Sequence, residues 1–295
     1  MVAPVLRWAA ALAVAGGAVG WWLTAPDPLP TDHLAGLDGD AAAGEQVFIA
    51  AGCASCHTAP GVEEADGPPV LAGGQRFETD FGTFVAPNIS TDPAHGIGGW
   101  SDLELANAIQ RGISPEGAHY YPAFPYTAYA RAEREDIADL IAYMRTLPAD
   151  ATPSQPHEIG FPFNIRRSLG GWKRLYARDD WVVTGELDSE VARGRYLVEA
   201  LGHCGECHTP RNALGGLDRD NWLSGADNPE GDGRIPDITP AGLGWSAADI
   251  AAYLESGFTP EFDTAGGSMV SVIENTSRLP EDDRAAIAAY LVALP

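Results

Sequence analysis

The sequence predicts a mainly α-helical protein, in which two similar small domains follow one another behind an N-terminal hydrophobic helix. Three observations support this prediction. The pattern C-x-x-C-H occurs twice, at residues 53–57 and 204–208, and uses all four cysteines. The segments around the two copies resemble each other, with apolar residues at helical spacing in both halves. The first 25 residues include a long run without charge.

The C-x-x-C-H pattern is the attachment signature for c-type haem. Residues i, i+3 and i+4 share one face of a helical turn. Two thiols can therefore bond one porphyrin while the histidine ligates its iron. The pattern predicts two covalently attached haem c groups. The predicted haem-binding residues are Cys53, Cys56, His57, Cys204, Cys207 and His208.

A C-x-x-C pair is also found in zinc sites and in redox-active dithiols. Zinc ribbons bring their two pairs together over short loops, whereas these two pairs lie far apart in the chain. A thioredoxin-like dithiol is expected beside a strand-helix-strand pattern, and neither pair has that context. Haem attachment is therefore the favoured interpretation.

Composition excludes some functions. The net charge of −23 disfavours binding to nucleic acid, because the phosphate backbone would be repelled. The same charge disfavours electrostatic docking on anionic lipid and suits a basic protein partner. The apolar fraction of 45% is that of a globular protein. No constellation of catalytic acids and bases is evident, so no catalytic residue is predicted.

Residues 1–25 are predicted to be a signal peptide or a signal anchor. Arg7 precedes an uncharged run from Trp8 to Leu23. The small residues at 18–20 (Ala-Val-Gly) are typical of a cleavage site, whereas Trp21 and Trp22 suit the aromatic belt of a membrane helix. The anchor is favoured, with Arg7 cytoplasmic and the rest of the chain periplasmic. Residues 26–40, which are rich in Pro and Asp, are predicted to form an extended spacer that lifts the next domain off the bilayer.

Residues 41–150 are predicted to form the first domain. A helix over 41–51 leads into the first C-x-x-C-H motif. Ser101 is a suitable N-cap for a helix that ends near Gly112, and a last helix is expected over 134–146. Trp100 is interpreted as a core aromatic residue near the haem edge.

Residues 186–295 are predicted to form the second domain, because they repeat the first. Residues 194–202 match 44–52, and His203 is inserted before the motif. Residues 236–239 (Pro-Asp-Ile-Thr) match 87–90 (Pro-Asn-Ile-Ser), and 244–246 (Gly-Trp-Ser) match 99–101. The last helix also recurs, since 288–295 match 141–148.

The connector, residues 151–185, differs in composition. It holds five of the chain's 18 basic residues. One interpretation is a solvated linker. The other is a segment packed between the domains, with its arginines facing haem propionates or acidic surfaces. The five are Arg166, Arg167, Lys173, Arg174 and Arg178.

The sixth iron ligand of each haem is expected from later in its domain. Met269 lies in a loop shortly before the last helix and is predicted to ligate the second haem. Met144 lies on an apolar helix face and is interpreted as a core residue. The equivalent place in the first domain holds Phe124, which cannot ligate iron. His119 is one candidate there, and an open or differently ligated iron is the alternative.

The repeated units resemble class I cytochrome c domains. The strings at 87–93, 96–101, 121–126, 162–166 and 202–212 are similar to the cytochrome c subunits of bacterial membrane-bound dehydrogenases for alcohols, gluconate, aldehydes and related substrates. The resemblance covers about residues 40–295. Some relatives carry Met within the segment 122–126 or shortly after it, where this chain has Phe124 and Ala132.

This resemblance implies an electron-transfer subunit on the periplasmic side of the inner membrane. Its expected donor is a periplasmic or membrane-bound dehydrogenase, and its expected acceptor is quinone, a soluble cytochrome or a terminal oxidase. The alternative is a dihaem enzyme, either a peroxidase or a thiosulfate-oxidising cytochrome, with catalysis at the first haem.

Overall fold

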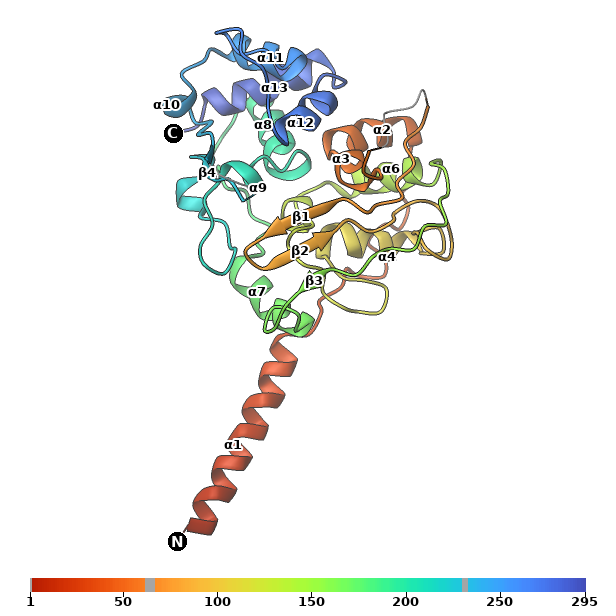
Figure 1. The fold of residues 1–295 in the computed structure, drawn as a ribbon, viewed down its shortest axis with the longest axis vertical. Helices are drawn as coiled ribbons and strands as arrows, with labels where there is room; N and C mark the ends of the chain where they lie inside the picture. Colours follow the sequence, from red (N-terminus) through yellow and green to blue (C-terminus); the bar gives the residue numbers. More distant parts are fainter. Residues whose placement is uncertain (1, 62–66, 230–232) are drawn as a thin grey trace.

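The computed structural model describes residues 2–61, 67–229 and 233–295, so Met1 lies outside the described part. The protein is mainly helical, as predicted. Figure 1 shows α1 (Val2–Leu23) projecting as a single straight helix from a globular part that contains two units. The stretch Val5–Leu23 has the length and apolar composition needed to cross a membrane, and none of it is buried.

Residues 26–40 lie along the first unit instead of standing free as an extended spacer. Leu29 is buried, and its backbone N–H donates a hydrogen bond of 2.8 Å to Asn107 Oδ1. His33 Nε2 lies 2.8 Å from Gln110 Oε1. Burying the apolar side chain of Leu29 fixes the segment against the helix that contains Asn107.

The first unit is helical around the first motif. The Asp40 side chain caps α2, and Ser101 forms a capping box with Glu104 at the start of α4, which confirms the predicted N-cap. Gly44 of α2 lies directly against the backbone of α6, where a Cβ atom would come within 1.9 Å of the Asp139 carbonyl oxygen. The helices are α2 (Ala41–Ala50), α3 (Cys53–His57), α4 (Asp102–Ala106), a π-helical turn η1 (Asn107–Arg111), α5 (Tyr126–Tyr129) and α6 (Arg134–Met144).

The connector is packed onto the first unit by a small antiparallel sheet of order β1-β2-β3. Strands β1 (Arg76–Thr79) and β2 (Gly82–Val85) form a hairpin. Strand β3 (Glu158–Ile159) of the connector pairs with β2, with Gly82 opposite Ile159. The connector then continues through a 3₁₀ turn, η2 (Arg166–Ser168), into α7 (Leu169–Tyr176) at the base of the globular part (Figure 1).

The connector's basic side chains bind mainly backbone carbonyl groups. Arg166 Nε donates to the His119 carbonyl oxygen at 2.6 Å, and its guanidinium lies over the ring of Tyr121. Lys173 Nζ donates to the carbonyl oxygens of Arg111 and Gly112 at 2.5 and 2.8 Å. The connector therefore packs against the protein, but these contacts are not the predicted ones with acidic surfaces.

The second unit repeats the helical plan of the first. Gly194 of α8 packs directly against the backbone of α13. A Cβ atom on Gly194 would lie 1.9 Å from the Ala286 carbonyl oxygen, so this contact repeats that of Gly44 with α6. Its elements are α8 (Ser189–Tyr196), a π-helical turn η3 (Leu197–Leu201), α9 (Gly205–His208), a 3₁₀ turn η4 (Arg219–Asn221), β4 (Ala226–Asp227), β5 (Arg234–Ile235), α10 (Pro240–Leu243), α11 (Ala247–Ser256), α12 (Met269–Thr276) and α13 (Glu281–Val292).

The π-helical turn η3 accounts for the residue inserted in the second unit. The Gly202 N–H bonds to the Leu197 carbonyl oxygen at 2.6 Å, five residues back, so the helix carries one residue more than an α-helix would. His203 then takes a left-handed backbone conformation, with φ 40°, before the second motif. The insertion is thereby absorbed before Cys204.

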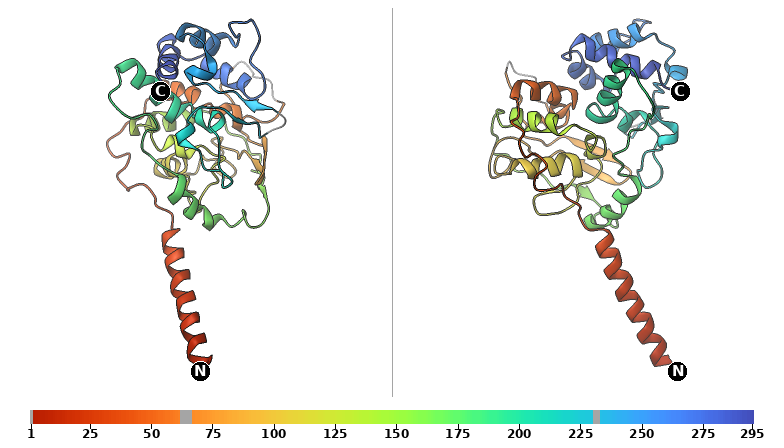
Figure 2. Two further views of the ribbon diagram at one scale, coloured as in Figure 1. Left: turned by 90° about the vertical axis from the view of Figure 1, so that its left-hand side faces the viewer. Right: turned by 180° about the vertical axis from the view of Figure 1, so that it is seen from behind.

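The two units share one hydrophobic core. A single cluster of buried side chains includes Phe48 and Leu140 of the first unit and Leu201, Leu254 and Tyr290 of the second. Trp100 and Trp245 are partly buried and pack against this cluster, which agrees with the interpretation of Trp100 as a core aromatic residue. The three views in Figures 1 and 2 show the units side by side, with α12 beside α2. The core holds them in a fixed relation.

Candidate functional site

Both C-x-x-C-H motifs form a single helical turn at the end of a longer helix. Gly52, with φ 61°, ends α2 in the left-handed region and starts the first motif. In the second motif the His208 N–H bonds to the Cys204 carbonyl oxygen at 3.0 Å. Helical geometry places both cysteines and the histidine of each motif on one side of the turn.

A prolyl carbonyl group orients each motif histidine. His57 Nδ1 lies 2.8 Å from the Pro87 carbonyl oxygen, and His208 Nδ1 lies 2.8 Å from that of Pro236. A carbonyl oxygen accepts only from N–H, so Nδ1 carries the proton and Nε2 keeps its lone pair. Burial also lowers the pKa of both imidazoles, which favours the neutral form. Both rings are therefore prepared to ligate a metal through Nε2.

The repeated sequence around Pro87 and Pro236 was visible, but its role was not predicted from the sequence. The same frame recurs around both histidines. The Gly73 N–H donates to the His57 carbonyl oxygen, and the Gly225 N–H donates to that of His208, both at 2.7 Å. Repetition of a proline about 30 residues after each motif was the signal that could have identified this support.

The cysteines do not have the properties of a redox dithiol. None of the four, all in the described part, forms a disulfide. Burial raises the pKa of the Cys53 and Cys204 thiols to about 12, and that of Cys56 to about 11. Reactive dithiols have a lowered thiol pKa instead. Among the described residues, no group of three or more His, Cys, Asp and Glu side chains is arranged to hold a zinc ion. This donor set fits thioether attachment and axial ligation of haem c.

The two motifs face each other across the boundary between the units. Asn275 Nδ2 of α12 donates to Ser55 Oγ, inside the first motif, at 2.7 Å. Thr127 Oγ1 donates to Glu206 Oε1, inside the second motif, at 3.0 Å. His203, the residue before the second motif, has its Nε2 3.3 Å from the carbonyl oxygen of Ala51, two residues before the first motif. Groups bound at the two motifs would therefore lie close together.

A network of buried hydrogen bonds supports the backbone of the second motif. A Cβ atom at Gly205 would lie 2.0 Å from the Trp222 ring, so the indole rests on the motif backbone. Trp222 Nε1 donates to Tyr290 Oη at 3.0 Å, and that hydroxyl donates to Glu199 Oε1 at 2.8 Å. The carboxylate of Glu199 also accepts from the Val182 N–H at 2.5 Å. These contacts fix the second motif against the last helix and the connector.

Comparison with known proteins identifies the family. A family model described as cytochrome c matches residues 41–148. A protein of Cereibacter sphaeroides described as "Diheme cytochrome c-type" is 58% identical over 287 residues, which cover 97% of this chain and 96% of that one. The chain belongs to the cytochrome c family. The second unit of this cytochrome lies outside the region matched by the family model, but it repeats the same histidine support.

Dehydrogenase subunits are also similar to this cytochrome. The "Fructose dehydrogenase cytochrome subunit" of Gluconobacter japonicus is 41% identical over 261 residues, which cover 85% of this chain and 52% of that protein. The "Alcohol dehydrogenase (quinone), cytochrome c subunit" of Gluconobacter oxydans is 35% identical over 272 residues, covering 85% and 54% respectively. The cytochrome spans about half the length of these subunits. The homology implies electron transfer.

Candidates for a sixth iron ligand lie in different surroundings. Met269, the first residue of α12, is partly buried against the shared core of this cytochrome. Met144 is buried in α6, which confirms its interpretation as a core residue. His119 is buried, but its Nε2 lies 3.0 Å from the Thr24 carbonyl oxygen at the end of α1. That contact joins His119 to the segment that follows α1, while its buried Nδ1 has no hydrogen-bond partner among the described residues. Ligation of the first haem by His119 stays a prediction.

Proposed function

We propose that this cytochrome is a dihaem electron carrier. It would accept electrons one at a time from a periplasmic or membrane-bound dehydrogenase and deliver them to quinone, a soluble cytochrome or a terminal oxidase. The observation that carries the proposal is the apposition of the two motifs, which contact each other's unit through Ser55 and Glu206. Two redox groups held close together in one rigid chain suit a relay.

Each proposed haem-binding residue has a defined part. Two cysteines per motif would hold one porphyrin covalently, and the two oriented histidines would present Nε2 to iron. Met269 would supply the sixth ligand of the second site. Haem c, when bound, supplies reversible one-electron chemistry at iron. The assigned residues are Cys53, Cys56, His57, Cys204, Cys207, His208 and Met269.

We also propose that α1 stays attached and anchors the cytochrome in the inner membrane. Its apolar stretch, Val5–Leu23, is long enough to cross a bilayer with Arg7 on the cytoplasmic side. The two units would then lie in the periplasm, in reach of a dehydrogenase partner.

The relay is tested on protein purified from a host that attaches haem c. After denaturation and extraction with acidified organic solvent, two haems per chain are expected to stay with the polypeptide. Coulometric reduction of the native protein is expected to consume two electrons per chain. Pigment that leaves the polypeptide, or a single electron per chain, would refute the proposal.

Catalysis at the first haem is the second candidate function, favoured by Phe124 and Ala132 at positions where some relatives have Met. Rapid binding of carbon monoxide to the reduced protein, together with turnover of peroxide, would favour this enzyme. A six-coordinate iron that does not bind carbon monoxide would favour the relay.

The contact between the units can be measured with a double-mutant cycle on Ser55 and Asn275. Neither residue is a proposed ligand, so both haems are expected to attach in Ser55→Ala, Asn275→Ala and the double variant. The lost hydrogen bond is expected to give a coupling of about 1 kcal/mol in the free energy of unfolding. Ser277→Ala is the control, because within the described residues its hydroxyl donates to the Glu274 carbonyl oxygen three residues earlier and not to the other unit. Additive effects of the two substitutions would show that the bond does not link the units.

A further inference from the structure

The C-terminal end of α1 is built into the globular part. The last carbonyl groups of a helix have no partner within the helix and attract cations. Here Arg167 Nη2 donates to the Trp21 carbonyl oxygen at 2.5 Å, and Arg167 Nε donates to Thr24 Oγ1 at 3.1 Å. Arg174 Nε donates to the Leu23 carbonyl oxygen. The Arg167 guanidinium also lies 4.2 Å from the centre of the Trp21 ring. Two side chains of the connector thus cap α1.

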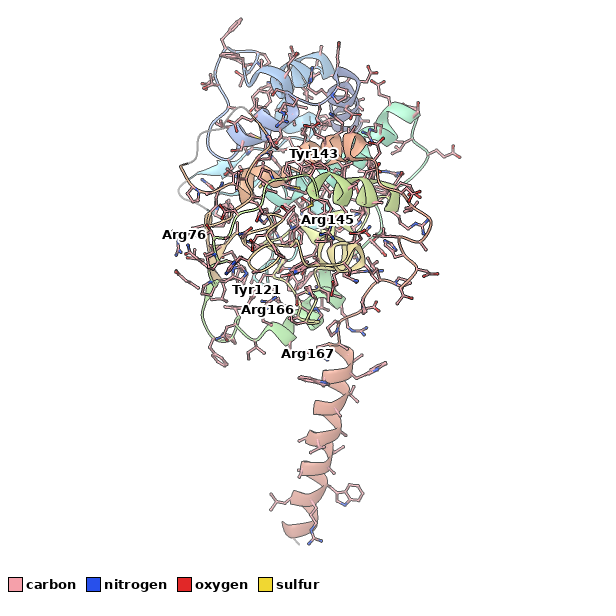
Figure 3. The ribbon with its side chains drawn as sticks, turned by 90° about the vertical axis from the view of Figure 1, so that its right-hand side faces the viewer. Arg76, Tyr121, Tyr143, Arg145, Arg166 and Arg167 are labelled. Carbon is pink, nitrogen blue, oxygen red and sulfur yellow. The ribbon has the colours of Figure 1, made fainter. Side chains whose placement is uncertain are left out.

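Close packing fixes the same junction. A Cβ atom on Gly170 of α7 would lie 2.2 Å from the Thr24 carbonyl oxygen and 2.8 Å from His119 Nε2. The backbone at Thr24, directly after α1, therefore packs closely against both α7 and the buried imidazole of His119. Figure 3 shows Arg167 directly at the point where α1 meets the globular part. The helix consequently leaves the protein in one direction, as the views in Figures 1 and 2 show.

Exposed apolar side chains lie in the connector segment that leads to this junction. Phe161 is 81% exposed, and Phe163 and Ile165 are also exposed. All three lie between β3 and η2, and Arg167 of η2 binds the end of α1. Large apolar side chains that are exposed within one short segment indicate a surface that meets an apolar environment.

The charge of this face differs from that of the whole chain. Five of the 18 basic residues lie between 166 and 178, although the net charge is −23. Of these five, Arg174 is exposed and donates to the Leu23 carbonyl oxygen at the end of α1. Trp21 and Trp22, 67% and 71% exposed, lie in the last turn of α1. Aromatic, basic and exposed apolar side chains are the residue types that proteins place at the membrane–water interface.

We propose that residues 161–175 and the end of α1 form a lipid-contact surface that rests on the phospholipid bilayer. Phe161 and Ile165 enter the interface, and Arg174 binds lipid phosphate. This inference rests on the proposed anchoring by α1. A bilayer is favoured over a protein partner because the apolar face is continuous with the helix that crosses the membrane. The surface would hold both units in one orientation to the membrane, and the overall negative charge does not prevent this local contact.

Photochemical crosslinking tests the surface on the full-length holoprotein in vesicles of phosphatidylethanolamine and phosphatidylglycerol. Benzoylphenylalanine is introduced in place of Phe161 or Ile165, and in place of Phe262 as the control. Phe262 is 89% exposed and lies in sequence between α11 and α12 of the second unit, two helices that Figure 1 shows away from α1. After irradiation, a mass shift of one phospholipid is expected at the first two positions and not at the control.

A crosslink from position 161 or 165 to a second copy or another polypeptide would overturn the inference, and so would the absence of any lipid adduct. The intact mass of the chain distinguishes failure of the lipid-contact surface from failure of the membrane anchor. A chain that retains residues 1–25 without a lipid adduct refutes the lipid-contact surface alone. A chain cleaved after residue 20 refutes both the anchor and the surface. The haem and electron counts of the relay do not depend on either result.

Discussion

Replacing Gly194 with alanine is expected to destabilise the second unit by about 3 kcal/mol or more, at the upper end of the cost of overpacking a core. The added Cβ would lie 1.9 Å from the Ala286 carbonyl oxygen, so α8 and α13 would have to separate. Backbone atoms on both sides cannot move aside as a flexible side chain would. Denaturant unfolding of the holoprotein, followed by circular dichroism, measures the loss. Gly44→Ala is expected to do the same to the first unit, where the clashing atom is the Asp139 carbonyl oxygen.

Gly171→Ala is the matched control, because it is also a glycine-to-alanine change within a helix. Its Cβ would lie 3.8 Å from Thr24 Cγ2, an ordinary contact. Alanine restricts the unfolded chain more than glycine does, so this variant is expected to be neutral or stabilised by up to ~1 kcal/mol. Equal stability of the Gly171 and Gly194 variants would show that the helix crossings are not as close as the structure has them.

Most of the correct predictions about the fold came from the internal repeat and from local helix signals. The helices over 41–50 and 134–144 agree with the predicted ranges, and Ser101 caps its helix as expected. Periodicity and capping are local signals, so they can be read from short windows. The matching of 194–202 with 44–52 also pairs the two crossing glycines. Their role became clear only from the packing of α8 on α13.

Contacts that are distant in sequence were not predictable. Nothing in residues 158–159 indicates that they extend the β1–β2 hairpin. One interpretation of the connector had its arginines facing haem propionates or acidic surfaces. Arg166 instead donates to a backbone carbonyl, as Lys173 does, and the contact with propionates stays a prediction. Backbone acceptors are present at every residue and leave no pattern in the sequence. For the same reason, the capping of α1 by Arg167 was not foreseen.

At the candidate site, the sequence identified the donor atoms but not their support. The motif spacing indicated the thiols and imidazoles. The prolyl carbonyls that fix the tautomers of His57 and His208 required the structure. The apposition of the motifs also depends on how the two units pack, since Asn275 and Ser55 are 220 residues apart.

Met269→Ala is expected to lower the reduction potential of one haem and leave the other nearly unchanged. A thioether ligand stabilises reduced iron, and loss of a methionine ligand lowers the potential. Axial ligands set haem potentials over ~0.8 V, so a shift of roughly a tenth of a volt or more is expected. Met269 lies at the start of α12, which packs on α11 of the second unit, so the affected haem is expected to be the second one. A potentiometric titration followed by visible spectroscopy measures both potentials.

Met144→Leu is the matched control, because Met144 is the buried methionine of the first unit and leucine preserves its packing. Both potentials are expected to stay at their wild-type values in this variant. The shape and stability of a core change little when leucine replaces methionine. A change in a reduction potential caused by Met144→Leu would therefore report loss of a ligand and not altered packing. If Met269→Ala leaves the spectrum and the titration unchanged, Met269 is not the sixth ligand. If Met144→Leu shifts a potential instead, the assignment of a methionine ligand moves to the first unit.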